Sequence, residues 1–279
     1  MSKKCTFTLN STNIVPVNGF NDRLVLRFPS RFFLPQNYGI ALTAGSLNYS
    51  WGNINDFFNN NTFSYTWLGS TYTVNMGNVY FLVSDINNYL HLIMKQNGHY
   101  LIDNTGNEIY YLNVQNNYTV YGNTITATPL PSSLPSGWSN PASVPLSAPN
   151  AITPQLVVSS NNFGQLIGFN PGSYPSVPQT SVYQTDSSFA PKLSPVLNPM
   201  IHCNFINVGN YTQYRDVVSM FVPQVQYGQP VDLSPKNLQY LDCISGTYDE
   251  LIITFTDEYN RPLRIQDSQI VLQFSLQPF

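Results

Sequence analysis

The sequence has few charged residues and few of the side chains that carry chemistry. Only 9% of the 279 residues are charged, and the formal net charge is -3, whereas about a quarter of an ordinary soluble protein is charged. Basic residues do not cluster beyond the adjacent pair Lys3 and Lys4. A nucleic-acid-binding face needs grouped Lys and Arg side chains to displace counterions. We therefore expect no nucleic-acid partner.

Long apolar runs are also missing. No segment approaches the roughly 18 apolar residues of a membrane span, and no apolar core of a signal peptide follows the basic pair near the start. We expect no membrane partner, and synthesis in the cytoplasm without a signal peptide. The three cysteines are odd in number and far apart, which does not make a disulfide framework. Cys5 and Cys203 lie in phase with apolar neighbours, so we interpret both as core residues.

Candidate catalytic and metal-binding residues do not combine into a site. His202 and Cys203 are adjacent in a predicted strand, so their side chains point to opposite faces. We expect His91, on a helix, and His99, after that helix, at surface or boundary positions. No zinc-ligand spacing, nucleophile elbow or phosphate-binding loop is present. The sequence therefore predicts no enzyme activity, no catalytic residue, no metal and no cofactor.

A turn near the C-terminus leaves one alternative open. Asp257, Glu258 and Asn260 occupy a single turn, and loop carboxylates can bind calcium in β-sandwiches. We favour a solvated hairpin loop that ends at Pro262.

Alternation of apolar and polar residues indicates β-strands along most of the chain. The pattern is clearest near the end, where two strands separated by a turn each bury one face. Their inward residues are Leu251, Ile253 and Phe255 in the first strand, and Ile270, Leu272, Phe274 and Leu276 in the second. Clusters of Gly, Pro and Asn separate the strands, as in a sandwich or barrel.

One helix interrupts the strands, at residues 84–98. Apolar residues recur there at helical spacing, Ser84 can cap the start, and Gly98 can end the helix. Asp85 and Lys95 suit the two ends of the helix dipole. The segment DNTGN then predicts a hairpin turn between two strands.

The middle of the chain is uncharged. Residues 109–185 contain no Asp, Glu, Lys or Arg, and seven prolines fall within 129–154, which excludes a central strand there. We predict that part of this stretch lies against a neighbouring subunit, because its apolar side chains can leave water without stranding a charge. These side chains are Leu130, Leu134, Trp138, Val144 and Leu146. The competing interpretation is an exposed loop.

These patterns predict an all-β protein: a single jelly-roll β-sandwich with one helix-plus-hairpin insertion. We place the jelly roll at residues 1–83 and 161–279, and the insertion of helix, hairpin and Pro-rich loop at 84–160. The segment NNFGQLIGFNPGSYP is grouped with the returning jelly-roll strands.

Four segments carry a resemblance to a known family. YTVNMGNVYFLVSDINNYLHLIMKQNGHYLID, FGQLIGFNPGSYP, SPVLNPMIHCNFINV and ISGTYDELIITFTDEYNRPLRIQDSQIVLQFSL together resemble the penton (minor capsid) proteins of virophages and Polinton or Maverick-like viruses. The resemblance covers most of the chain and rests on hydrophobic pattern and segment order. It implies an upright single jelly roll that forms a homopentamer at the capsid vertices of a virion, beside trimers of a double-jelly-roll major capsid protein. No catalytic or metal residues are carried over from it.

A carbohydrate-binding, lectin-like jelly roll is the alternative. It would bind glycans through Tyr and Trp side chains such as those of Trp51, Trp67 and Trp138.

Overall fold

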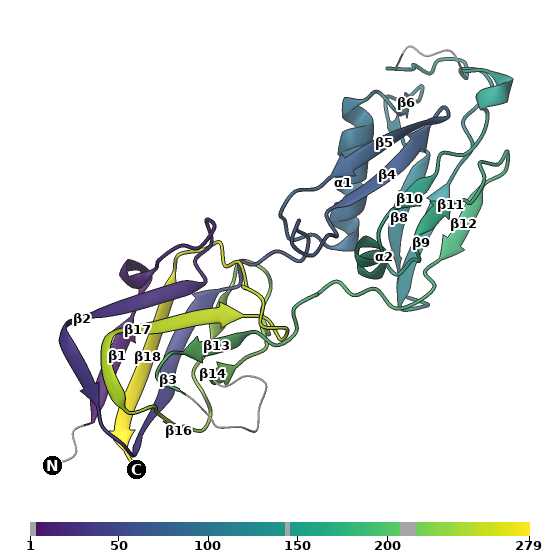
Figure 1. Cartoon of the computed structure of the whole chain (residues 1–279). Coiled ribbons are helices and arrows are strands. Elements are labelled where there is room, and N and C mark those ends of the chain that lie inside the picture. Colours follow the sequence, from purple (N-terminus) through teal and green to yellow (C-terminus); the bar gives the residue numbers. More distant parts are fainter. Residues whose placement is uncertain (1–3, 143–145, 207–215) are drawn as a thin grey trace. The chain divides into compact units, whose positions relative to one another are not determined.

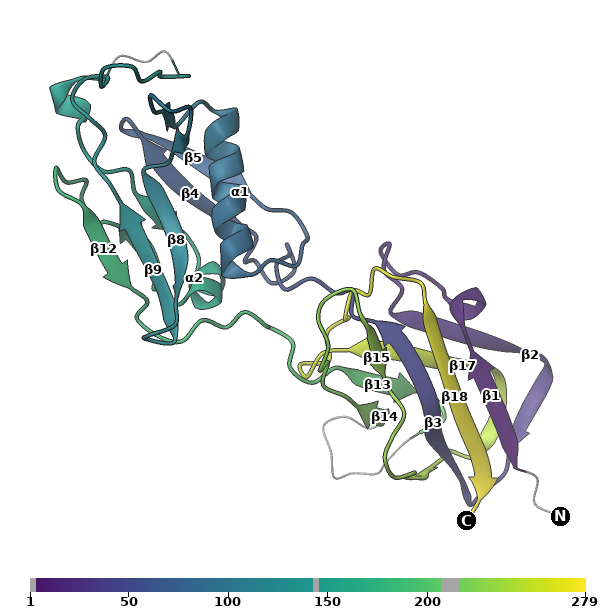
Figure 2. The same ribbon diagram turned by 180° about the vertical axis from the view of Figure 1, so that it is seen from behind.

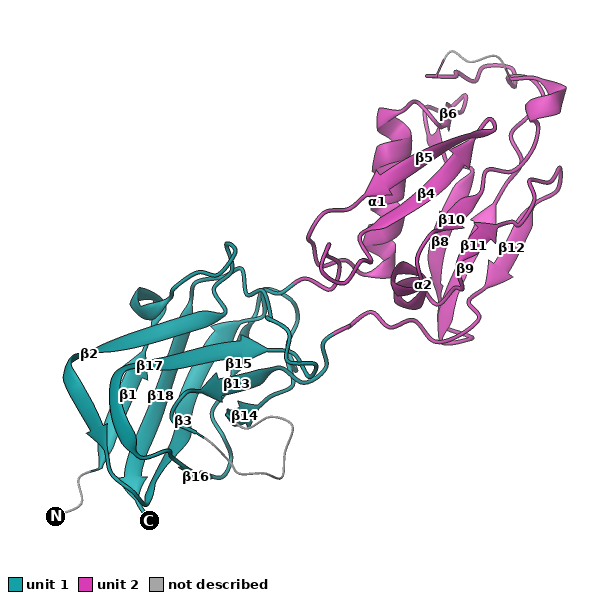
Figure 3. Cartoon of the chain, in the orientation of Figure 1, with its two compact units in different colours: residues 1–51, 196–279 teal, residues 52–195 magenta. Residues whose placement is uncertain are grey.

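The computed structural model describes residues 4–142, 146–206 and 216–279. Contacts divide the chain into two compact units (Figure 3). Unit 1 combines Met1–Trp51 with Val196–Phe279, and unit 2 is Gly52–Pro195. No helix in the described residues is long and apolar enough to cross a membrane.

Unit 1 is built from two antiparallel sheets (Figure 1). The first has the order β1 (Cys5–Leu9), β18 (Ile270–Pro278), β3 (Tyr38–Asn48), β15 (Pro230–Asp232), and the two-residue β16 (Leu241–Asp242) also pairs with β3. The second has the order β14 (Val217–Met220), β13 (Met200–Cys203), β17 (Gly246–Thr256), β2 (Arg23–Leu34). A short 3-10 turn, η1 (Ser11–Asn13), lies between β1 and β2.

The strand order is that of a jelly roll. If the strands of these two sheets other than β16 are numbered along the chain, the first sheet has the order 1-8-3-6 and the second 2-7-4-5. Strands from the two ends of the chain therefore alternate within each sheet, as in a double Greek key. The predicted all-β fold with a jelly-roll sandwich is confirmed.

The alternating residues near the C-terminus face the core as predicted. Each of the seven inward side chains is at most 1% exposed, and pairs such as Phe7 with Phe274 and Leu9 with Leu272 lie opposite each other in register. Burial of each such side chain stabilises the fold by about 1.5–3 kcal/mol. The two strands do not form a hairpin with each other: β17 and β18 belong to different sheets (Figure 2).

Unit 2 has sheets and a core of its own. One sheet has the order β11 (Gly172–Tyr174), β10 (Leu156–Val158), β4 (Thr62–Trp67), β5 (Ser70–Asn75), and another β12 (Tyr183–Asp186), β9 (Gly122–Ala127), β8 (Leu112–Asn117). Helix α1 (Val83–Gln96) packs against β8 through Ile86, Leu90 and Met94. The hydrophobic cluster of this unit runs from Ile54 to Phe169, entirely within 52–195.

The insertion is therefore longer than predicted. The expected boundaries at 83/84 and 160/161 both fall inside unit 2, and the contacts place the boundaries at 51/52 and 195/196. Strands β4 and β5 alternate as regularly as jelly-roll strands, but they pair with each other and with β10 of unit 2. A period of two identifies a strand and does not say which sheet it joins.

The predicted helix and hairpin are present, with a different cap. Helix α1 begins after Leu82, whose N–H donates to Oδ2 of Asp85 at 2.9 Å, so Asp85 satisfies the first turn instead of Ser84. Gly98 ends the helix with a φ of +73°. The hairpin pairs β6 (Leu101–Ile102) with β7 (Glu108–Ile109) around the expected turn.

Residues expected to continue the strands form a second helix. Helix α2 (Asn161–Ile167) begins at Ser160, whose Oγ accepts from the N–H of Phe163, and ends at Gly168 with a φ of +88°. The carbonyl oxygen of Phe169 occupies the space that a Cβ on Gly164 would take. Gly164 therefore lets the chain fold back closely on this helix. A further 3-10 turn, η2, covers Ala148–Asn150.

Candidate functional site

The histidine and cysteine of β13 are structural. His202 is buried and bonded at both ring nitrogens, from Nδ1 to Asp216 at 2.8 Å and from Nε2 to the hydroxyl of Thr256 at 2.6 Å. Cys203 lies fully buried opposite Ile253, and burial raises the pKa of its thiol to about 12. A thiol with so high a pKa is a poor nucleophile and metal ligand at neutral pH. Within 4–142, 146–206 and 216–279, no three His, Cys, Asp or Glu side chains gather as a metal site.

His99 is buried, contrary to the expectation of a surface or boundary residue. Its side chain is 5% exposed, and its ring stacks on Trp67 with the centroids 5.2 Å apart. The hydroxyl of Tyr65 lies 2.8 Å from Nδ1. Local sequence pattern does not reveal this burial, because the residue follows a helix-ending glycine. His91 is half-buried on α1 and bonds the carbonyl of Leu112 at 3.1 Å.

The acidic turn is organised by one buried carboxylate. Asp257 is 1% exposed; it accepts from the backbone N–H groups of Tyr259 and Arg261, both at 2.9 Å, and forms an ion pair with Arg261 Nε at 2.6 Å. Glu258 accepts from the N–H of Leu197 at 3.2 Å. The carboxylates of this turn are thus used by the protein itself, and Asp257 lies deeper than the solvated loop we expected.

The tryptophans of the lectin-like alternative are not displayed. Trp51 and Trp67 are 2% and 3% exposed, and Trp138 packs half-buried against the core of unit 2. An aromatic ring binds a sugar only through an open face, so neither of the buried rings is available.

The Pro-rich stretch is partly covered by its own chain. Leu130 is 3% exposed, and Leu146, like Trp138, packs against the core of unit 2. Leu134 remains 43% exposed, and Val144 lies outside the described residues. The covered side chains cannot leave water at a neighbouring subunit, so these residues no longer support the predicted subunit contact.

Three neighbouring strands of one sheet in unit 1 are free of charge. Strands β1, β18 and β3 contain no Asp, Glu, Lys or Arg, whereas the short edge strands β15 and β16 end in the exposed Asp232 and Asp242. The outward positions of β1, β18 and β3 carry neutral side chains, many of them small, and the exposed ones include Thr6, Thr8, Ser46, Val271 and Gln273. We call this surface the neutral face.

The other sheet carries charge instead. Arg27 pairs with Glu250 across β2 and β17 at 4.0 Å, and Arg31 pairs with Asp249 at 3.6 Å. Three of these four side chains are at least 80% exposed, so the pairs add little stability. Because charged side chains are strongly hydrated, covering this sheet with another protein would cost desolvation energy. The neutral face carries no such cost.

An apolar groove runs along the edge strand β14. It encloses about 480 Å³, and its lining contains no charged side chain. Met220 on this strand is 66% exposed. The lining residues are Leu42, Met200, Val217, Val218, Ser219, Met220, Pro235, Asn237, Gln239 and Leu241. An exposed edge with apolar side chains is a liability unless another chain covers it.

Comparisons with known proteins give similarity only at the level of structure. No family model and no curated protein sequence matches the chain. The chain is similar to the mavirus penton protein, with 13% identity over 100% of this chain and 99% of the other, at a TM-score of 0.46. It is also similar to a chain in the cryo-EM structure of the Sputnik virophage, with 12% identity over 99% and 97% of the two chains, at a TM-score of 0.38.

Proposed function

We propose that this chain is a structural virion protein, a penton (minor capsid) protein whose homopentamers close the vertices of an icosahedral capsid. Its neighbours there would be copies of a double-jelly-roll major capsid protein. The observation that carries the proposal is the jelly-roll strand order together with the neutral face. Jelly rolls are a common architecture of capsid subunits, and the sequence resembles the penton family in four segments.

The distribution of charge supports assembly through unit 1. Desolvation of a charged side chain costs several kcal/mol unless it is paired, and the cores of protein interfaces are depleted in such side chains. The neutral face and the β14 groove can both be covered without that cost. Closed cyclic symmetry also hides strand edges that would be a liability on a monomer.

The carbohydrate-binding jelly roll remains the second candidate for unit 1 as a fold class, because lectins share this architecture. The burial of Trp51 and Trp67 removes two of the three side chains on which that candidate rested.

A matched pair of variants tests the assembly proposal. Thr8→Arg adds a charge to the neutral face, and Thr247→Arg adds the same charge to an exposed position of β17 in the charged sheet. We expect the wild type and Thr247→Arg to have the mass of a pentamer in solution, and Thr8→Arg to form smaller species that keep the circular dichroism spectrum of the folded wild type. Co-expression with a double-jelly-roll coat protein should place the wild type at vertices by electron microscopy. A monomeric wild type that never joins such capsids would refute the proposal.

A further inference from the structure

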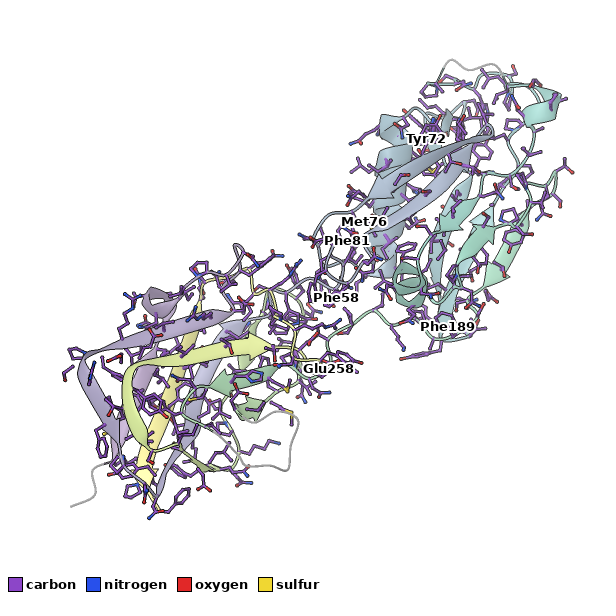
Figure 4. All side chains as sticks on the ribbon, in the orientation of Figure 1. Phe58, Tyr72, Met76, Phe81, Phe189 and Glu258 are labelled. Carbon is purple, nitrogen blue, oxygen red and sulfur yellow. The ribbon has the colours of Figure 1, made fainter. Side chains whose placement is uncertain are left out.

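We propose that a cleft on α1 in unit 2 binds a neutral pyranose sugar. The cleft is shallow and open to solvent; it is lined by Tyr80, Phe81, Asp85, Asn88, Tyr89 and Leu92, and its volume is about 480 Å³. All six residues belong to one short segment of unit 2, and Figure 4 labels Phe81 among them. This site goes beyond the proposed capsid role and does not depend on it.

Helical spacing brings the polar and aromatic groups to one side of α1. Asp85, Asn88, Tyr89 and Leu92 stand at i, i+3, i+4 and i+7, which is a single helix face. The opposite face of α1 is buried through Ile86, Leu90 and Met94. The cleft is therefore presented on a helix whose position the core of unit 2 fixes.

Two aromatic rings form adjoining walls of the cleft. The centroids of Phe81 and Tyr89 are 5.7 Å apart, and their planes are inclined by 49°. Both rings are half-buried, so each keeps an accessible part. The face of an aromatic ring carries partial negative charge, which attracts the C–H groups that line one face of a pyranose. Aromatic walls of this kind suit a sugar ring.

The two rings are held in place before any ligand arrives. The hydroxyl of Tyr89 donates to the carbonyl of Asn75 at 3.0 Å. The backbone of Phe81 is clamped by the buried side chain of Asn53, which accepts from its N–H at 2.9 Å and donates to its carbonyl at 2.8 Å. A preorganised site loses less conformational entropy on binding.

Unused polar atoms stand beside the rings. Asn88 is exposed, and its side-chain amide makes no hydrogen bond with the described residues. Asp85 uses Oδ2 for the N–H of Leu82, and its other carboxylate oxygen has no such partner in the described part of the chain. A sugar hydroxyl both donates and accepts, so it complements a carboxylate oxygen and an amide.

The charge of the lining selects a neutral ligand. Asp85 is its one ionisable acid, and no Lys or Arg lines the cleft. An anionic sugar would therefore meet a carboxylate without a balancing cation, which is unfavourable at short range. Repulsion by the Asp85 carboxylate would therefore favour neutral hexoses and N-acetylhexosamines over sialylated glycans.

The test is ligand-observed NMR of the full chain with glucose, galactose, mannose, N-acetylglucosamine, lactose and sialyllactose. We expect binding of at least one neutral sugar in the millimolar range. Asn88→Ala should weaken it about tenfold through the lost hydrogen bonds, and Tyr80→Ala should weaken it because a third aromatic ring that lines the cleft is lost. Gln96→Ala, an exposed amide on the same helix outside the cleft, is the matched control and should bind as the wild type does.

Three outcomes would overturn the proposal: no response to any neutral sugar, binding of sialyllactose alone, or equal binding by the wild type, Asn88→Ala and Tyr80→Ala. Ala at exposed position 88 favours the helix, so this variant stays folded, and the melting temperature of Tyr80→Ala checks the other. Because the readout is sugar binding by the dissolved protein, its failure is separate from a failure of capsid assembly.

Discussion

Three side chains of unit 2 form a buried hydrogen-bonded chain. The hydroxyl of Tyr65 accepts from the amide of Asn97 at 2.9 Å and lies 2.8 Å from Nδ1 of His99. Burial lowers the pKa of His99 to about 4, whereas an exposed histidine has a pKa of about 6.5. The His99 ring is therefore neutral in the folded protein at neutral pH.

This difference predicts a loss of stability in acid. Above about pH 6.5 neither state binds the extra proton, so His99 has no effect there. Between about pH 6.5 and pH 4 the unfolded chain binds the proton and the folded protein does not. The free energy of unfolding therefore decreases as the pH is lowered. The full loss is on the order of 3 kcal/mol, and it stays constant below about pH 4.

Urea unfolding followed by tryptophan fluorescence measures the effect, because Trp67, one of the three tryptophans, stacks on His99. His99→Gln, which cannot be protonated, is the comparison. We expect a shallower pH dependence in that variant. Equal slopes in the two proteins would show that other groups dominate.

At the scale of elements, the end of α1 depends on one glycine. The N–H of Gly98 donates to the carbonyl of Lys95 at 3.0 Å and that of His99 to the carbonyl of Met94 at 2.7 Å, which together form a Schellman motif. Gly98 has a φ of +73°, and a Cβ there would lie 3.1 Å from the backbone of Ala142.

We expect Gly98→Ala to lower the free energy of unfolding by about 1–2 kcal/mol. Gly106→Ala is the control, because Gly106 also has a positive φ, +89°, but no atom lies within 4 Å of its added Cβ. Gly106→Ala therefore shows the cost of backbone strain alone, and the additional loss in Gly98→Ala measures the crowding against Ala142. Chemical denaturation of both variants makes the comparison, and an equal loss would mean that the Ala142 contact is unimportant.

The sequence predicts elements well where periodicity is long and turns are marked. Helix α1 spans four turns with a clear apolar face, and the strands near the C-terminus bury alternate residues. Helix α2 was missed because seven residues are too few to separate a helical period from an apolar run. Its two signals were Ser160 as a cap and Gly168 as a terminator.

The whole molecule contains a unit that is continuous in sequence and complete in its core. The side chain of Asn53, at the start of unit 2, donates to the carbonyl of Leu193, near its end, at 2.8 Å. We therefore expect residues 52–195 alone to fold and to unfold cooperatively. Circular dichroism and amide dispersion in NMR measure this. A fragment that stays disordered would mean that unit 2 needs unit 1.

The boundaries between the two units could not be predicted from the sequence, for a physical reason. The crossings at 51/52 and 195/196 carry no flexible linker of Gly and Ser, and Trp51 beside the first crossing is buried. The neutral face, by contrast, can be read from the sequences of β1, β18 and β3 once these strands are paired. Local sequence pattern does not show which strands pair, because pairing joins residues more than 200 positions apart, such as Cys5 and Leu276.

The jelly-roll strand order also determines when each strand can pair during synthesis on the ribosome. β18 lies between β1 and β3, and β17 lies between β2 and β13, so the earliest strands wait for the last ones to be made. At about 5–20 residues per second, β3 leaves synthesis roughly 10 to 40 seconds before β17 begins. All residues of unit 2, Gly52–Pro195, are synthesised in that interval. A nascent chain at that stage carries all residues of unit 2 while β1 and β2 lack their partner strands, and β3 can pair only with the short β15 and β16. A stalled or truncated chain exposes the unpaired edges to aggregation.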